Sequence, residues 1–182
     1  MSVVLASGHL VDRPDRRAPR FPERIVPLVA SAIADALDRW QVAEGSVVVC
    51  GGARGADMLS AEAALARGAQ VILCLAAPTE EFVAESVRLP GTEWEERFRR
   101  LLSHAEVRHI PTTNMGTNKF ARTNAWMVGT VRELTSTPYA LLVWDGEVGD
   151  GPGGTQDMVE RLGYSLTDPH IEIIDPTALL DE

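Results

Sequence analysis

The sequence lacks several features that mark particular classes of protein. It has only two cysteines, Cys50 and Cys74, and each lies in an apolar run, which predicts buried strand residues. No CxxC or Cys/His spacing indicates a zinc site, and we predict no metal ion and no cofactor. No apolar run approaches the roughly 18 residues that span a bilayer, and the first residues do not resemble a signal peptide. We therefore expect a cytoplasmic protein without a membrane partner.

Basic residues are also few. The 182-residue chain has 17 Lys and Arg residues against 26 Asp and Glu residues, which gives a net charge of −9. Surfaces that bind nucleic acid usually carry an excess of basic residues, so we expect no long nucleic acid as a partner. The charge does not exclude a small anionic ligand, because the binding of such a ligand depends on local donors.

The order of the predicted elements indicates an α/β fold. Strands are predicted at residues 2–7, 47–50, 70–75, 107–110, 139–144 and 171–174. Helices are predicted at residues 22–40, 57–67, 78–82, 92–105, 119–134 and 155–162. Most strands are continuous apolar runs, which is typical of strands covered on both faces. The pattern predicts one domain, residues 1–182, with a Rossmann-like, doubly wound, mainly parallel sheet and helices on both faces.

One stretch, residues 47–57, is the main candidate for a ligand site. It reads VVVCGGARGAD, which predicts a strand, a tight glycine-rich loop and a helix N-terminus. The first helical turn has unpaired backbone N–H groups, and glycine lets a ligand approach the backbone closely, so the loop suits a phosphate or another anion. The predicted ligand contacts here are Gly51, Gly52, Arg54, Gly55, Ala56 and Asp57. The alternative is a plain turn with a solvated Arg54.

A second glycine-rich helix start follows the strand at residues 139–144. Because carboxyl ends of parallel strands share one sheet edge, this loop should lie near the first one and could hold phosphate or ribose hydroxyls. The alternative is a merely flexible loop. Polar residues at a strand end or on an apolar helix face add further candidates. The ligand contacts predicted outside the first loop are Gly8, His9, Asn124, Asp145, Gly153, Gly154 and Thr155.

Together these motifs resemble the SLOG superfamily. The resemblance rests on GGARGAD at residues 51–57 and PGGT at residues 152–155, and it spans nearly the whole chain. Members include the Lonely Guy phosphoribohydrolases, the DNA-processing protein DprA and stand-alone nucleotide-sensing domains. The resemblance implies a Rossmann-like fold, a nucleotide or nucleotide-derived ligand, and a homodimer. The pattern is similar to sensor-type members.

The resemblance to the phosphoribohydrolases is partial. Their segment Pro-Gly-Gly-x-Gly-Thr-x-Glu-Glu is shortened here, and Asp157 stands where they have a glutamate. Arg122 is a near match to an arginine of those enzymes, but Thr123 replaces the neighbouring lysine. If the chain is such an enzyme, Asp157 or Glu160 would supply the catalytic carboxylate, and Arg122 or Arg54 would hold the phosphate.

Three functions therefore stay open at the level of sequence. The first is binding or sensing of a nucleotide or nucleotide-derived ligand at the carboxyl edge of the sheet. The second is an N-glycosidic phosphoribohydrolase that releases a base from a nucleoside monophosphate. The third is an interaction scaffold without a ligand. The intact glycine-rich helix starts, beside an incomplete catalytic pattern, favour the first.

Overall fold

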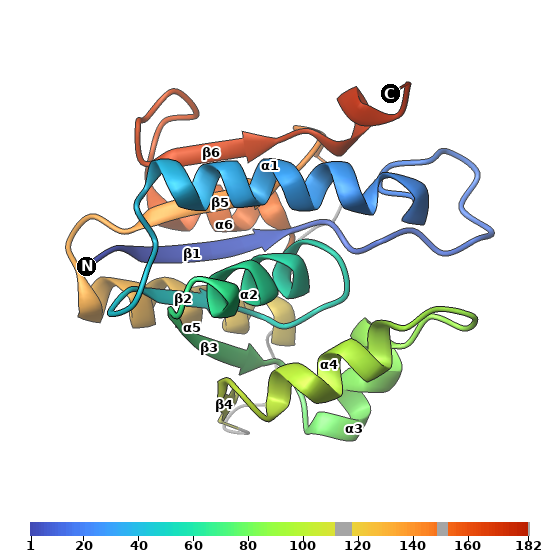
Figure 1. Cartoon of the computed structure of the whole chain (residues 1–182), viewed down its shortest axis with the longest axis horizontal. Helices are drawn as coiled ribbons and strands as arrows, with labels where there is room; N and C mark the ends of the chain where they lie inside the picture. The colour runs from blue at the N-terminus through green and yellow to red at the C-terminus, as the bar shows by residue number, and fades with distance from the viewer. Residues whose placement is uncertain (112–117, 149–152, 182) are drawn as a thin grey trace.

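A single parallel sheet organises the chain (Figure 1). The computed structural model describes residues 1–111, 118–148 and 153–181. The strands are β1 (Val3–Gly8), β2 (Val47–Cys50), β3 (Gln70–Leu75), β4 (Glu106–His109), β5 (Tyr139–Val143) and β6 (Ile171–Ile174). Their order in the sheet is β4-β3-β2-β1-β5-β6, and every neighbouring pair is parallel. The predicted Rossmann-like α/β fold is confirmed.

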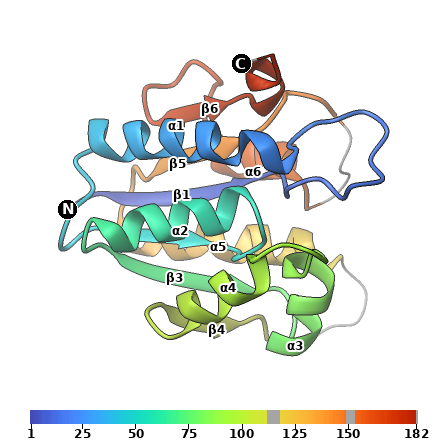
Figure 2. The same cartoon turned by 45° about the vertical axis from the view of Figure 1, so that its right-hand side comes forward.

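Helices cover both faces of the sheet. They are α1 (Val26–Arg39), α2 (Ala56–Ala66), α3 (Thr79–Phe82), α4 (Trp94–Leu102), α5 (Lys119–Leu134) and α6 (Thr155–Leu162), with short turns η1 (Glu23–Ile25), η2 (Val83–Val87) and η3 (Pro176–Leu179). Figures 1 and 2 show α1 and α2 on one side of the sheet and α5 and α6 on the other. Helix α4 shares the core of the α1 and α2 side.

Apolar runs in the strands explain the two cores. In β1, Val4 and Ala6 belong to the core beneath α1, α2 and α4, whereas Val3 and Leu5 belong to the core beneath α5 and α6. Successive side chains of a strand point to opposite faces, so a strand buried on both faces must be apolar throughout. Strand β4 is different, because it lies at the sheet edge and none of its residues is fully buried.

The strand order reverses between β1 and β5. The chain moves outward from β1 through β2 and β3 to β4, then returns to place β5 on the other side of β1. Loops that leave β1 and β5 therefore diverge, and the crevice between them is the usual ligand site of such sheets. The two strands approach closely at their ends, where Gly8 pairs with Val143. Gly8 has a φ of +150°, and an added Cβ would collide with the Val143 carbonyl oxygen.

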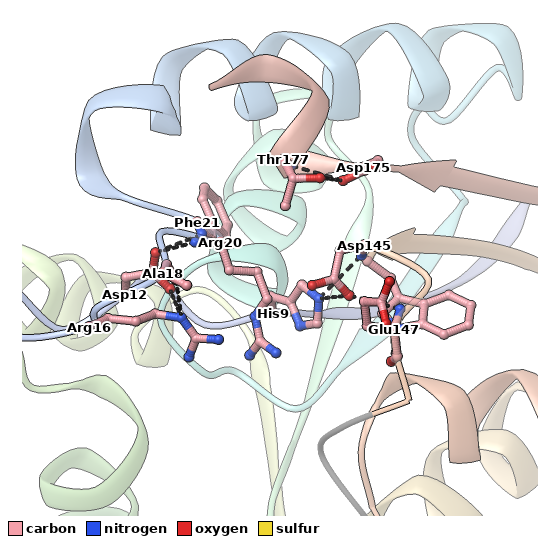
Figure 3. Close-up of polar contacts among 11 residues, drawn as sticks. His9, Asp12, Arg16, Ala18, Arg20, Phe21, Asp145, Glu147, Asp175 and Thr177 are labelled. Atoms are coloured by element: carbon pink, nitrogen blue, oxygen red, sulfur yellow. Dashed lines mark hydrogen bonds and ion pairs between the residues drawn. The ribbon is translucent and has the colours of Figure 1, made fainter. Parts of the chain in front are cut away.

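The long connection after β1 is fastened to the body of the protein. The Asp12 carboxylate accepts hydrogen bonds from the backbone N–H groups of Arg20 (2.7 Å) and Phe21 (2.8 Å), as Figure 3 shows. The Phe21 side chain is fully buried. These contacts fix the path of residues 10–22 and place Arg20 near the carboxyl edge of the sheet.

Candidate functional site

Two adjoining cavities lie at the carboxyl edge beside the switch between β1 and β5. The inner lobe, of about 100 Å³, is lined by Ser7, Gly8, Leu10, Gly51, Ala53, Asp57, Cys74, Ala76, Phe82, Ser86, Phe120, Thr123, Asn124, Met127 and Gly153. The outer lobe, of about 260 Å³, is lined by Ser7, Gly8, His9, Leu10, Arg20, Asn118, Phe120, Gly153, Gly154 and Thr155. Five residues line both lobes, so the two cavities form one cleft.

The cleft brings together much of what the sequence predicted. The predicted contacts that line it are Gly8, His9, Gly51, Asp57, Asn124, Gly153, Gly154 and Thr155. They come from the ends of β1 and β2, from α5 and from the start of α6. Both glycine-rich helix starts therefore reach the same cleft from opposite sides of β1.

Other predicted contacts face away from the cleft. They are Gly52, Arg54, Gly55, Ala56, Asp145, Arg122 and Asp157, none of which lines either lobe. A Cβ on Gly52 would face Leu75 and Phe98 in the core, at 3.3 to 3.4 Å. Gly55 has a φ of +99°, and a Cβ there would lie 2.8 Å from the His9 carbonyl oxygen. These two glycines shape the loop and its contact with β1 instead of opening it to a ligand.

Arg54 turns into the protein. Its side chain is buried, and Nε donates to the Val11 carbonyl oxygen at 3.0 Å. Its backbone N–H donates to the Ser86 carbonyl oxygen at 3.0 Å. Burial and the nearby Arg13 lower the pKa of Arg54 from its ordinary value. The arginine therefore ties the loop after β1 to the loop after β2, and it does not offer its fork of donors to the cleft.

His9 and Asp145 form a pair at the ends of β1 and β5. The His9 Nε2 atom lies 3.0 Å from Asp145 Oδ1. Figure 3 draws this contact. Partial burial by itself would raise the pKa of Asp145, but the contact with His9 and the Glu147 N–H outweigh it and lower that pKa. His9 lines the outer lobe together with Arg20. Asp145 thus acts on the cleft by orienting His9.

Asn124 joins α5 to the start of α6. Its Nδ2 donates to the Gly154 carbonyl oxygen at 3.1 Å and to Asp157 Oδ2 at 3.0 Å. The same Asp157 oxygen accepts from Arg161 Nε at 2.8 Å. Partial burial would raise the pKa of Asp157, but the bonds from Arg161 and Asn124 prevail and lower it. Asp157 is therefore an ion-paired carboxylate that holds Asn124 in the wall of the inner lobe.

Asp57 places a buried carboxyl group in the wall of the inner lobe. It is 8% exposed, and its Oδ2 accepts the Ala53 backbone N–H at 3.2 Å. Its Oδ1 is buried, and no described residue offers it a hydrogen-bond partner. Burial raises the pKa of Asp57 to about 7, despite hydrogen bonds from the backbone of the loop. This carboxyl group changes its charge near neutral pH.

The outer lobe has the character of an anion site. Gly154 and Thr155 place the N-terminus of α6 in its wall, and Asn118 caps the N-terminus of α5 by accepting the Phe120 backbone N–H at 2.9 Å. Helix N-termini carry partial positive charge and unpaired N–H groups. Arg20 adds a cationic side chain to the same lobe. An anionic group such as phosphate fits this combination.

Sequence reasoning did not single out several residues that line the cleft. Arg20 lies in a basic cluster of an acidic chain, and Asn118 directly precedes a predicted helix, so each carried a usable signal. Thr123 was noted only as the replacement of a family lysine, and Phe120 and Ser86 carried no signal, because only the packing of α5 and η2 against the sheet edge brings them to the inner lobe.

Within residues 1–111, 118–148 and 153–181, no group of three or more His, Cys, Asp and Glu side chains could hold a metal ion. Among the helices that the structure describes, none is both long and apolar enough for a membrane span.

Comparisons with known proteins give distant structural likenesses and no family. No protein-family model matches the chain, and no curated protein matches it significantly. Solved structures similar to it include DprA from Streptococcus pneumoniae (13% identity, TM-score 0.46, covering 100% of this chain and 61% of that one). The Moco carrier protein from Chlamydomonas reinhardtii is 13% identical, with a TM-score of 0.34 over 99% of this chain and 93% of that one. The structural-genomics target TM1055 is 15% identical, with a TM-score of 0.38 over 100% and 99%.

The chain spans 61% of the length of DprA.

Proposed function

We propose that the chain is a SLOG-like domain that binds a nucleotide or nucleotide-derived small molecule in the cleft between β1 and β5. The observation that carries the proposal is the convergence of two glycine-rich helix starts on one cleft at the switch point of the sheet. Ligand sites of doubly wound sheets lie at this position. Sensing, and not chemistry, is the role that we favour.

The two lobes suit the two ends of a nucleotide. The outer lobe, with Arg20 and the N-termini of α5 and α6 in its wall, suits a phosphate. The inner lobe, with Phe82, Phe120 and Met127 beside a few polar groups, suits a flat heterocycle. Ser7 and Gly8 line both lobes, so one ligand would pass over the end of β1.

Hydrolysis of an N-glycosidic bond is the weaker alternative. It would need a carboxylate within reach of the anomeric carbon and a cation at the phosphate. Asp157 does not line the cleft, and its Oδ2 already accepts from Asn124 and Arg161. The Arg122 guanidinium donates to the Pro111 carbonyl oxygen at 2.6 Å and does not line either lobe. Both predicted catalytic residues are therefore occupied elsewhere.

Calorimetry with a panel of nucleoside monophosphates, dinucleotides and cyclic nucleotides tests the proposal. We expect at least one of them to bind, and Ser7→Phe to abolish its binding, because Ser7 is half-buried and lines both lobes. Ser31→Phe, the same change at an exposed position of α1, is the matched control and should bind normally. If no panel member binds to the folded protein, the proposal is wrong and the interaction scaffold is favoured.

A further inference from the structure

Asp57 lines the inner lobe, and the loop after β2 holds only one of its two carboxylate oxygens. Oδ2 accepts the Ala53 N–H at 3.2 Å, and it lies so close to Gly51 that an added Cβ there would be 2.9 Å from it. Oδ1 is buried and has no hydrogen-bond partner among the described residues. A buried polar atom without a partner is costly, so its retention beside a cavity indicates a partner that the ligand supplies.

Other polar side chains of the inner lobe also have acceptors left over. Both amide hydrogens of Asn124 are used, toward Gly154 and Asp157, so its remaining polar atom, Oδ1, can only accept. The Thr123 hydroxyl donates its hydrogen to the Lys119 carbonyl oxygen at 2.8 Å, which leaves lone pairs. The hydroxyls of Ser7 and Ser86 can rotate to do either. The fixed hydrogen-bonding capacity of these side chains is therefore that of acceptors.

We propose that the inner lobe binds an N–H-donating head group, such as the amino edge of a nucleobase, with Asp57 Oδ1 as its principal acceptor. This inference rests on the proposed function, since it names the end of the nucleotide that enters the inner lobe. The two ends of the cleft then select different chemical groups of the ligand. The inner end offers hydrogen-bond acceptors, and the outer end offers the N–H donors of helix N-termini. A ligand with N–H groups at one end and a phosphate at the other matches both.

The proposal couples binding to protonation. The pKa of Asp57 is about 7, so at neutral pH the protonated and the ionised carboxyl groups are both populated. An N–H donor of the ligand would bind to the ionised form. A bound N–H donor favours the carboxylate and expels the proton. Binding at pH 7 should therefore release up to about half a proton from this group. As pH falls below 7, the contribution of the N–H groups to affinity should fall by up to about tenfold per pH unit.

The other ionisable groups around Asp57 do not account for the expected pH dependence of ligand affinity. Cys50 on β2 and Cys74 on β3 stay neutral thiols, because burial raises the pKa of Cys50 well above its ordinary value and that of Cys74 to about 12. At the start of α5, Lys119 is paired with Glu81 of α3 and Glu85 of η2. The other charged groups near the cleft in the described part of the chain include Arg54, which binds the Val11 carbonyl oxygen, Asp157, which is paired with Arg161, and His9, Asp145 and Arg20 at the outer lobe.

The phosphate of the ligand loses its second proton near about pH 6, and His9 is a further ionisable group at the outer lobe. A comparison of two ligands that differ only in an amino group cancels both contributions, because each ligand carries the same phosphate. The probes are AMP, GMP and CMP, each beside its analogue without the amino group. Those analogues are purine riboside 5′-monophosphate, IMP and 2-pyrimidinone riboside 5′-monophosphate, in that order.

Isothermal titration calorimetry at pH 6, 7 and 8 measures the affinity ratio of each pair. For the tightest binder of the three, we expect the amino group to improve binding by about tenfold or more at pH 8, as a hydrogen bond to a charged acceptor does. The ratio should shrink toward pH 6. Equal affinities within each pair at every pH would overturn this inference and leave the proposed function standing. If none of the six monophosphates binds, this inference fails, and the dinucleotides and cyclic nucleotides of the calorimetric panel decide the proposed function.

The variant Asp57→Asn tests the acceptor itself. The amide oxygen can keep the bond from Ala53, and Nδ2 then takes the place of Oδ1 and offers a donor. The preference for the amino ligand should disappear or reverse, and the ratio should no longer change with pH. Asp35→Asn, at an exposed position of α1, is the matched control and should behave as the wild type. If Asp57→Asn does not fold, the pH series on the wild type decides the question.

Discussion

Burial of Asp57 makes a prediction about the stability of the free protein. The folded-state pKa of about 7 lies above the ordinary 3.8, so the folded protein binds this proton more tightly than the unfolded chain does. Its contribution to stability is fully present below about pH 4 and is lost as the pH rises through 7. Asp57→Asn removes the titrating group and keeps an oxygen for the Ala53 N–H. The stability of the wild type should therefore fall with pH relative to the variant.

The magnitude follows from the two pKa values. The difference between about 7 and 3.8 corresponds to about 4 kcal/mol at high pH, since one pH unit is worth about 1.4 kcal/mol. Between pH 5 and pH 8, linkage assigns about 2.5 kcal/mol of this to the wild type alone. Urea unfolding of both proteins at the two pH values measures it, and groups that they share, such as the paired Asp157 and Asp145, cancel. Parallel changes in the free energy of unfolding would refute the reasoning.

Two further predictions concern the cleft and its frame. Gly8→Ala should destabilise the protein by roughly 2 to 4 kcal/mol, because the new Cβ would lie 2.9 Å from Val143 Cα and alanine rarely adopts the φ of this position. The control is Gly129→Ala, in open space on α5, which should stabilise the protein by about 0.5 to 1 kcal/mol. Thermal unfolding of both variants checks the pair, and equal effects would contradict the account of the β1–β5 approach. Incubation with AMP, GMP or CMP should release no free base, because Asp157 and Arg122 are held outside the cleft. Asp157→Asn should alter the affinity for the nucleotide only through its contact with Asn124. Chromatographic detection of free base at high protein concentration would restore the hydrolase.

The sequence was sufficient for the fold because its strands are buried on both faces. Apolar runs such as Val47–Cys50 and Gln70–Leu75 leave little choice of element, and the strand–helix alternation leaves little choice of sheet. Strands β2, β3 and β6 and helix α5 begin and end at the predicted residues. The π-helical turn at Val83–Val87 was not predicted, since no periodicity marks an extra residue per turn.

The sequence was sufficient to predict where the candidate site lies, but it was not sufficient to predict what several of the residues do there. That both glycine-rich helix starts reach one edge follows from parallel strands, and eight of the predicted contacts line the cleft. The inward turn of Arg54 was not predictable, because it depends on the Val11 carbonyl oxygen, which lies 43 residues away in the sequence. The same holds for Asp157, whose partner Asn124 belongs to another helix. Contacts between loops decide these orientations, and sequence patterns describe only the loops themselves.

Crystals grown with the nucleotide that binds most tightly in calorimetry test the central claim most directly. The account predicts ligand density in the cleft, with the phosphate at the backbone N–H groups of Gly154 and Thr155 and the base in the inner lobe beside Asp57. Density for the nucleotide elsewhere on the protein, with this cleft empty, would contradict it.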